Sequence, residues 1–104
     1  MKLHPKIRRE QILCAALRIA ERPGGWAKLT ITAIAQEARC SYGLVCFHLG
    51  SIGAIRRETV KAAIKNENFD ALIQALIAND PEANRMKPLL KQKAFAHIQS
   101  AGVS

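Results

Sequence analysis

The fold is decided by the stretch TITAIAQEARCSYGLVCFH, residues 30–48. Thr30 and Ser41 each precede an apolar stretch, and a hydroxyl at such a position can cap the free backbone N–H groups at the start of a helix. The first of these helices is predicted to stop near Arg39 and Cys40, and the second starts directly after them. The stretch therefore predicts two short helices joined by a tight turn.

Helical periodicity continues on both sides of this stretch. Apolar residues recur at three- and four-residue spacing, and no strand alternation competes with them. The run Arg22-Pro23-Gly24-Gly25 ends the first helix, and Pro81 opens a single turn before the last helix. The predicted helices cover about residues 5–21, 30–39, 41–49, 51–65, 69–78 and 88–99. The predicted fold class is all-α: a three-helix helix-turn-helix bundle, extended by a longer fourth helix and a C-terminal helical hairpin.

Positive charge is confined to one part of the chain. The net charge is +8 over 104 residues. Residues 1–65 hold 12 basic and 4 acidic side chains, whereas residues 66–104 hold 4 of each. Such a segregated excess favours a polyanionic partner, because each phosphate contact releases a condensed counterion. We therefore expect nucleic acid as the partner of residues 1–65.

The two helices at residues 30–49 have the arrangement of a helix-turn-helix unit. In such units the first helix braces the second, which projects its N-terminal half into the major groove of DNA. The crossing needs a small residue, which Ala35 supplies, while Cys40 suits the turn and Val45 anchors the second helix. The other side of that helix carries the residues expected to face DNA: Tyr42, Gly43, Leu44, Phe47 and His48.

Several strings between Arg8 and Val60 form one pattern. They are Ile12-Leu13-Cys14-Ala15-Ala16-Leu17, Leu29-Thr30-Ile31, Ile34-Ala35, Ala38, Cys40-Ser41, Gly43 and His48-Leu49. The pattern resembles the DNA-binding half of tetracycline-repressor (TetR) family regulators. The resemblance implies that Thr30 touches a phosphate. It also implies base and backbone contacts for the N-terminal part of the second helix, Ser41, Tyr42, Gly43 and Leu44. The C-terminal part, Cys46, Phe47 and His48, would grip the backbone and thymine methyl groups.

The chain departs from the family pattern at three positions. Arg39 stands where the family usually has a turn glycine, and it could itself reach a phosphate. Cys46 replaces a phosphate-contacting tyrosine, and Ile52 replaces a lysine at the start of the fourth helix. Two backbone contacts are thus missing. Two groups of cations could compensate for them: the N-terminal arm, with Lys6, Arg8 and Arg9, and the pair Arg56 and Arg57.

The chain is much shorter than the family pattern implies, because only about forty residues follow the fourth helix. That is too little to enclose a drug-sized cavity of roughly 300 Å³, so we expect no small-molecule effector. Residues 66–104 are instead expected to form a dimerisation region in one compact unit with residues 1–65. Its apolar stripe would serve as core and homodimer interface: Phe69, Leu72, Ile73, Leu76, Ile77, Leu90, Phe95 and Ile98.

Other classes of function find little support in the sequence. Acidic residues are few and dispersed, so no catalytic constellation is expected and the protein is predicted not to be an enzyme. The cysteines and histidines lack the spacing of a zinc module, so neither a metal nor another cofactor is expected. No apolar run approaches the ~18–20 residues that span a bilayer, and the odd, unpaired cysteines favour a reducing, cytoplasmic setting.

These observations predict a sequence-specific regulator of transcription that binds double-stranded DNA as a homodimer. Its operator would be a near-palindrome, its simplest action repression, and its small size suggests a phage or plasmid. One alternative is an accessory protein for replication, partition or nucleoid organisation, which would bind DNA with little sequence preference. Another is a protein–protein module such as an anti-repressor, which would use the C-terminal helical hairpin to place a helix in a partner's groove.

Overall fold

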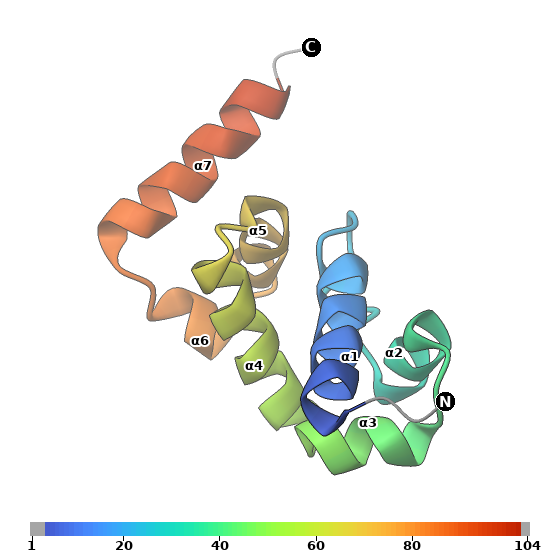
Figure 1. Cartoon of the computed structure of the whole chain (residues 1–104). Coiled ribbons are helices and arrows are strands. Elements are labelled where there is room, and N and C mark those ends of the chain that lie inside the picture. Colours follow the sequence, from blue (N-terminus) through green and yellow to red (C-terminus); the bar gives the residue numbers. More distant parts are fainter. Residues whose placement is uncertain (1–3, 103–104) are drawn as a thin grey trace.

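Helices make up most of the computed structural model, which describes residues 4–102. This part of the chain contains no strand, so the prediction of an all-α fold is confirmed. The helices are α1 (Pro5–Ala20), α2 (Ile31–Ala38), α3 (Tyr42–Leu49), α4 (Ile52–Lys65), α5 (Phe69–Ile77), α6 (Pro81–Asn84) and α7 (Pro88–Gly102) (Figure 1). The last helix extends past Gln99, where the sequence pattern was expected to end it.

Short polar side chains start α2, α3 and α4 as predicted. The hydroxyls of Thr30 and Ser41 accept hydrogen bonds from the backbone N–H groups of Ala33 and Leu44, each at 3.1 Å. Ser51 starts α4 in the same way. Each hydroxyl satisfies a donor that the helix itself leaves without a partner, which is why the starts of α2, α3 and α4 could be predicted to the residue.

Three helices end in the same way, with a non-glycine residue in the left-handed backbone region. These residues are Arg39 after α2 (φ 55°), Glu67 after α4 (φ 50°) and Asn79 after α5 (φ 59°). At the end of α2 the next backbone N–H, that of Cys40, bonds back to the carbonyl oxygen of Ala35 at 3.0 Å. This closing geometry uses carbonyl groups that the helix leaves free, and it turns the chain sharply into α3.

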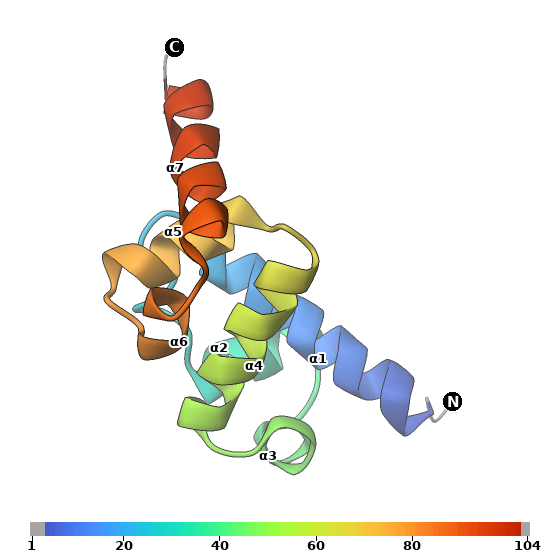
Figure 2. The ribbon, with the colours of Figure 1, turned by 90° about the vertical axis from the view of Figure 1, so that its left-hand side faces the viewer.

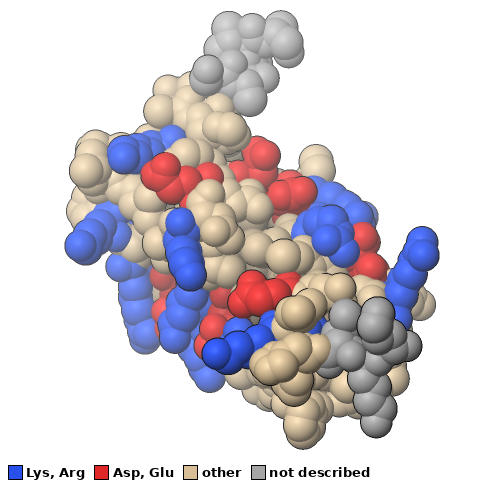
Figure 3. Space-filling model, viewed as in Figure 1, with Lys and Arg blue, Asp and Glu red and all other residues tan. Residues whose placement is uncertain are grey.

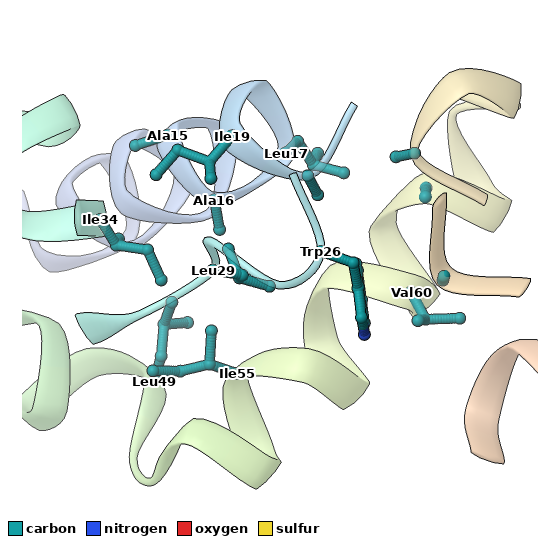
Figure 4. Packing of buried hydrophobic residues seen from close by; sticks show 14 of the residues in the cluster. Ala15, Ala16, Leu17, Ile19, Trp26, Leu29, Ile34, Leu49, Ile55 and Val60 are labelled. Carbon is teal, nitrogen blue, oxygen red and sulfur yellow. The ribbon is translucent and has the colours of Figure 1, made fainter. Parts of the chain in front are cut away.

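The hydrophobic core lies around α1, which packs against α2, α3, α4 and α5. Trp26 and Leu29, from the connection between α1 and α2, point into the space between α1 and α4 (Figure 4). Gly25 lets this connection pass close to the end of α1, since a Cβ there would collide with the carbonyl oxygen of Ile19. The same core continues into α5, where Leu72 is fully buried. The two predicted regions therefore share one core.

The C-terminal helices form the predicted pair, with α7 packed on α5 and α6 in the connection between them. His97 on α7 contacts two residues of α5. Its Nε2 lies 3.2 Å from a carboxylate oxygen of Asp70, and the centre of its ring lies 5.5 Å from that of Phe69. In both ribbon views α7 projects away from the bundle, at the end of the molecule opposite α3 (Figures 1 and 2). The pair is thus placed far from the predicted DNA-binding helix.

Two residues of the predicted dimer interface belong to the core instead. Leu72 and Ile73 are buried within the chain itself, with 0% and 2% of their surface exposed. The prediction that they contact a second copy is wrong, because both lie on the side of α5 that the rest of the chain covers. An amphipathic stripe shows which side chains are buried, but it does not show by which partner.

Candidate nucleic-acid interface

Helix α3 has a buried side and an exposed side. Val45 and Leu49 point into the core, where α3 packs against α1, α2 and α4. On the opposite side Phe47 has 80% of its surface exposed, and Tyr42 at the start of the helix is also exposed. A phenylalanine so exposed gains almost nothing from packing within its own chain. The predicted reading side of α3 is therefore free to meet another molecule.

The exposed side of α3 is almost entirely apolar. Of the predicted contact residues, Gly43 is exposed, whereas Leu44, Cys46 and His48 are partly buried at its borders. The His48 ring stands edge-on to that of Phe47, with the ring centres 5.1 Å apart. In Figure 3 the lower tip of the molecule, where Figure 1 places α3, has the colour of uncharged residues. Positive charge for a polyanion must come from neighbouring elements.

Cations lie on both sides of the C-terminal end of α2. One cleft, of about 590 Å³, lies between α1 and the end of α2, and it is lined by Lys6 of α1 and by Arg39. Arg39 also lines a second cleft, of about 530 Å³, together with Lys28 from the connection before α2. The structure thus brings two predicted residues together and adds Lys28, which the sequence interpretation missed. Its position two residues before the capping Thr30 was the available signal.

The N-terminal arm is divided between two surfaces. Whereas Lys6 faces the end of α2, Arg9 lies against α4, where its guanidinium is 3.4 Å from a carboxylate oxygen of Glu58. Arg8 is partly buried. The charge of Arg9 is therefore partly offset by an acidic partner on α4, and the expected DNA contact of the arm stays a prediction. The sequence could not show this pairing before the position of α4 was known.

The other expected source of compensating charge lies between α4 and α6. Arg56 and Arg57 line a cleft of about 370 Å³ between α4 and α6, which also contains Asp80 and Glu82. Asp80 and Glu82 bring negative charge to the same cleft, so the positive charge of the two arginines is partly offset there. Their role in replacing the missing phosphate contacts stays a prediction.

Glu37 holds the ends of α1 and α2 together beside Arg39. Its carboxylate accepts hydrogen bonds from Arg18 at 3.2 Å and from Arg22 at 3.0 Å. These two hydrogen bonds, supported by the positive charges, lower the pKa of Glu37 below its usual value. Arg18 and Arg22 are thereby committed to a structural contact, whereas Arg39 takes part in none of the ion pairs among the described residues.

The three cysteines differ in exposure. Cys40 is partly buried and packs against the core at the turn, as expected. Cys46 is also partly buried, whereas Cys14 is exposed. Among residues 4–102, no three histidine, cysteine or acidic side chains come together in a way that could hold a metal ion.

The predicted dimer residues outside the core fall into two groups. Ile77 and Phe95 expose 73% and 54% of their surface, and Ile98 is exposed as well. The second group is only partly buried and packs against the core: Phe69, Leu76 and Leu90. Leu89, which the sequence interpretation did not single out, is a further exposed apolar residue of α7. The α5–α7 pair therefore presents apolar side chains that the described residues leave exposed.

Comparison with known proteins found no matching family model, no similar curated protein and no similar solved structure. Within the described part of the chain, none of the helices has both the length and the apolar character that crossing a membrane requires. The features that bear on function are consequently the geometry of α1–α4 and the exposed surface of α5 and α7.

Proposed function

We propose that this protein is a sequence-specific regulator of transcription, similar to the TetR family, which binds double-stranded DNA as a homodimer. The observation that carries the proposal is the setting of α3. It is capped by Ser41, braced by α2 across a tight turn, and exposes Phe47 at the end of the molecule opposite α7. A helix presented in this way has the shape that enters a major groove.

The backbone contacts of the proposed complex come from residues around the end of α2, the helix that precedes α3. Lys6, Lys28 and Arg39 line the two clefts there, and their charge would attract the phosphates. The Thr30 and Ser41 hydroxyls accept backbone hydrogen bonds, which leaves the hydroxyl hydrogen of each for a phosphate oxygen. Contacts of this kind fix the register of the protein on DNA without reading its sequence.

The proposed homodimer uses the exposed apolar side chains of the α5–α7 pair: Ile77, Phe95 and Ile98. Residues 66–104 carry equal numbers of basic and acidic side chains, so two copies would meet there without net repulsion. Two α3 helices would then enter successive major grooves about 34–36 Å apart, on a near-palindromic operator. Blocking polymerase at that operator is the simplest action, and the cytoplasm is the proposed location.

The proposal includes no cofactor and no small-molecule effector. Release from DNA would then depend on a protein partner or on protein concentration.

A protein–protein module is the second candidate, and the apolar surface of α3 is the observation that favours it. A helix that exposes phenylalanine and leucine resembles those that bind in the apolar groove of a partner. Lys6, Lys28 and Arg39 around the end of α2 would have no role in that case, which is why we favour DNA.

Selection of bound sequences from random duplex DNA tests the proposed function. We expect enrichment of one near-palindromic sequence. Binding without enrichment, with a steep dependence on salt, would instead support an accessory role in replication or nucleoid organisation. Absence of binding to any duplex would refute both DNA-binding functions and leave the protein–protein module.

A further inference from the structure

The exposed side of α3 has a chemical character that bears on which bases it could read. At about 100° per residue, Gly43 and Leu44 lie closest to Phe47 around the helix, and Val45 and Leu49 lie opposite. We call Gly43, Leu44 and Phe47 the apolar face of α3. Tyr42 and His48, which end in polar atoms, lie about 140° and 100° from Phe47 by the same geometry.

Helix α3 lacks every side chain that usually distinguishes bases by hydrogen bonding. Guanine is read by arginine or lysine, adenine by asparagine or glutamine, and cytosine by aspartate or glutamate. None of these six residue types occurs between Tyr42 and Leu49. The remaining base feature in the major groove is the 5-methyl group of thymine, which apolar side chains contact. The apolar face is therefore suited to methyl groups alone.

The geometry of the apolar face allows the close approach that such a contact needs. Phe47 has 80% of its surface exposed, so its ring is available without any rearrangement of the chain. One turn earlier, a Cβ on Gly43 would meet only the Ser41 hydroxyl, at 3.9 Å. The fold itself thus does not require glycine at this position, and the missing side chain leaves room for a base edge beside the Phe47 ring.

We propose that the apolar face of α3 recognises the 5-methyl group of pyrimidines and accepts 5-methylcytosine in place of thymine. The two bases differ at position 4, where thymine has a carbonyl oxygen and cytosine an amino group. Distinguishing them needs a donor or an acceptor, and the apolar face has neither. Methylation of cytosine would then create or strengthen binding sites. This inference rests on the proposed function.

The test starts from the duplex that the wild-type protein selects. In one series each thymine in the half-sites is replaced by deoxyuridine, which removes only the methyl group. In a second series the same thymine is replaced by cytosine or by 5-methylcytosine, and these two bases differ from each other only in that methyl group. Burying one methyl group contributes about 0.8 kcal/mol. At the contacted position we therefore expect about fourfold weaker binding per half-site with uracil. We expect 5-methylcytosine to bind about fourfold more tightly than cytosine.

Two variants assign the effect to α3. Phe47→Ala should bind the thymine and uracil duplexes with equal affinity. Leu89→Ala removes a similarly exposed apolar side chain from α7 and should keep the fourfold difference. Circular dichroism and thermal unfolding establish that both variants are folded.

Two results overturn the inference while leaving the proposed function intact. One is selective binding that does not change when thymine is replaced by uracil. The other is 5-methylcytosine that binds no better than cytosine at every position. Absence of selective binding to any duplex would overturn the proposed function, and this inference with it.

Discussion

Arg39→Gly is expected to stabilise the protein and to weaken its binding to DNA. Arg39 follows α2 with φ 55° and ψ 48°, in the left-handed region. That conformation is unfavourable for a residue with a Cβ by roughly 1–2 kcal/mol, whereas glycine adopts it freely but loses roughly 0.5–1 kcal/mol more backbone entropy on folding. The net gain is about 0.5–1 kcal/mol, or about 4 °C in the thermal midpoint of a domain of this size.

The DNA-binding effect of the same substitution has the opposite sign. If Arg39 contacts one phosphate in each protomer, its loss removes two contacts from the dimer. The slope of log K against log salt should then become less steep by about 1.8, since each phosphate contact contributes about 0.9. Thermal unfolding and binding titrations at several salt concentrations measure the two effects separately.

Two matched variants separate strain from charge. Glu67→Gly relieves the same backbone conformation after α4, so it should raise the thermal midpoint and leave the salt slope unchanged. Arg39→Lys keeps both the charge and the strained backbone, so both measurements should stay near those of the wild type. The reasoning is refuted if Arg39→Gly lowers the thermal midpoint, or if its salt slope equals that of the wild type.

Three further predictions concern the core, the dimer and the link between α1 and α2. Val45→Ala should lower the free energy of unfolding by about 2 kcal/mol, because the side chain is fully buried. Phe47→Ala should lower it by less than about 1 kcal/mol, since the ring is exposed. The reverse order in urea unfolding would contradict the described packing of α3. Phe95→Glu should shift the protein from dimer to monomer in analytical ultracentrifugation. Leu89 precedes Ile98 by nine residues, which places it on the opposite side of α7, so Leu89→Ala should leave the dimer intact. A Phe95→Glu variant that is still dimeric would exclude this surface as the interface. Glu37→Gln should be less stable than the wild type at pH 7 but not near pH 3. A carboxyl group with a lowered pKa stabilises the fold at pH values above its ordinary pKa of 4.5, and it loses that effect as the pH falls through its pKa in the folded protein. If urea unfolding gives the same difference in stability at both pH values, the ion pairs of Glu37 contribute nothing.

Local chemistry explains what could be predicted from the sequence. Thr30, Ser41 and Ser51 start their helices because a hydroxyl can satisfy a nearby backbone N–H. Val45 could be placed in the core from its spacing alone. Such features depend on residues within one turn of each other, so they can be read without knowing the fold.

Features that depend on how distant segments meet could not be predicted in the same way. Arg9 pairs with Glu58, which lies 49 positions later in the chain, so its charge is partly offset by a helix whose position the sequence does not reveal. Leu72 and Ile73 follow the same periodicity as Ile77, yet only Ile77 remains exposed. The role of Lys28 depends on the cleft that it shares with Arg39, which exists only in the folded chain.

A hydroxyl-radical footprint on the selected duplex, combined with methylation interference in the major groove, tests the central claim most directly. The wild-type protein is predicted to protect two equivalent half-sites one helical turn apart. The Phe47→Ala variant is predicted to give no protection at the same protein concentration. A single protected segment, protection confined to the minor groove, or a footprint that Phe47→Ala leaves unchanged would contradict the placement of α3 in the major groove.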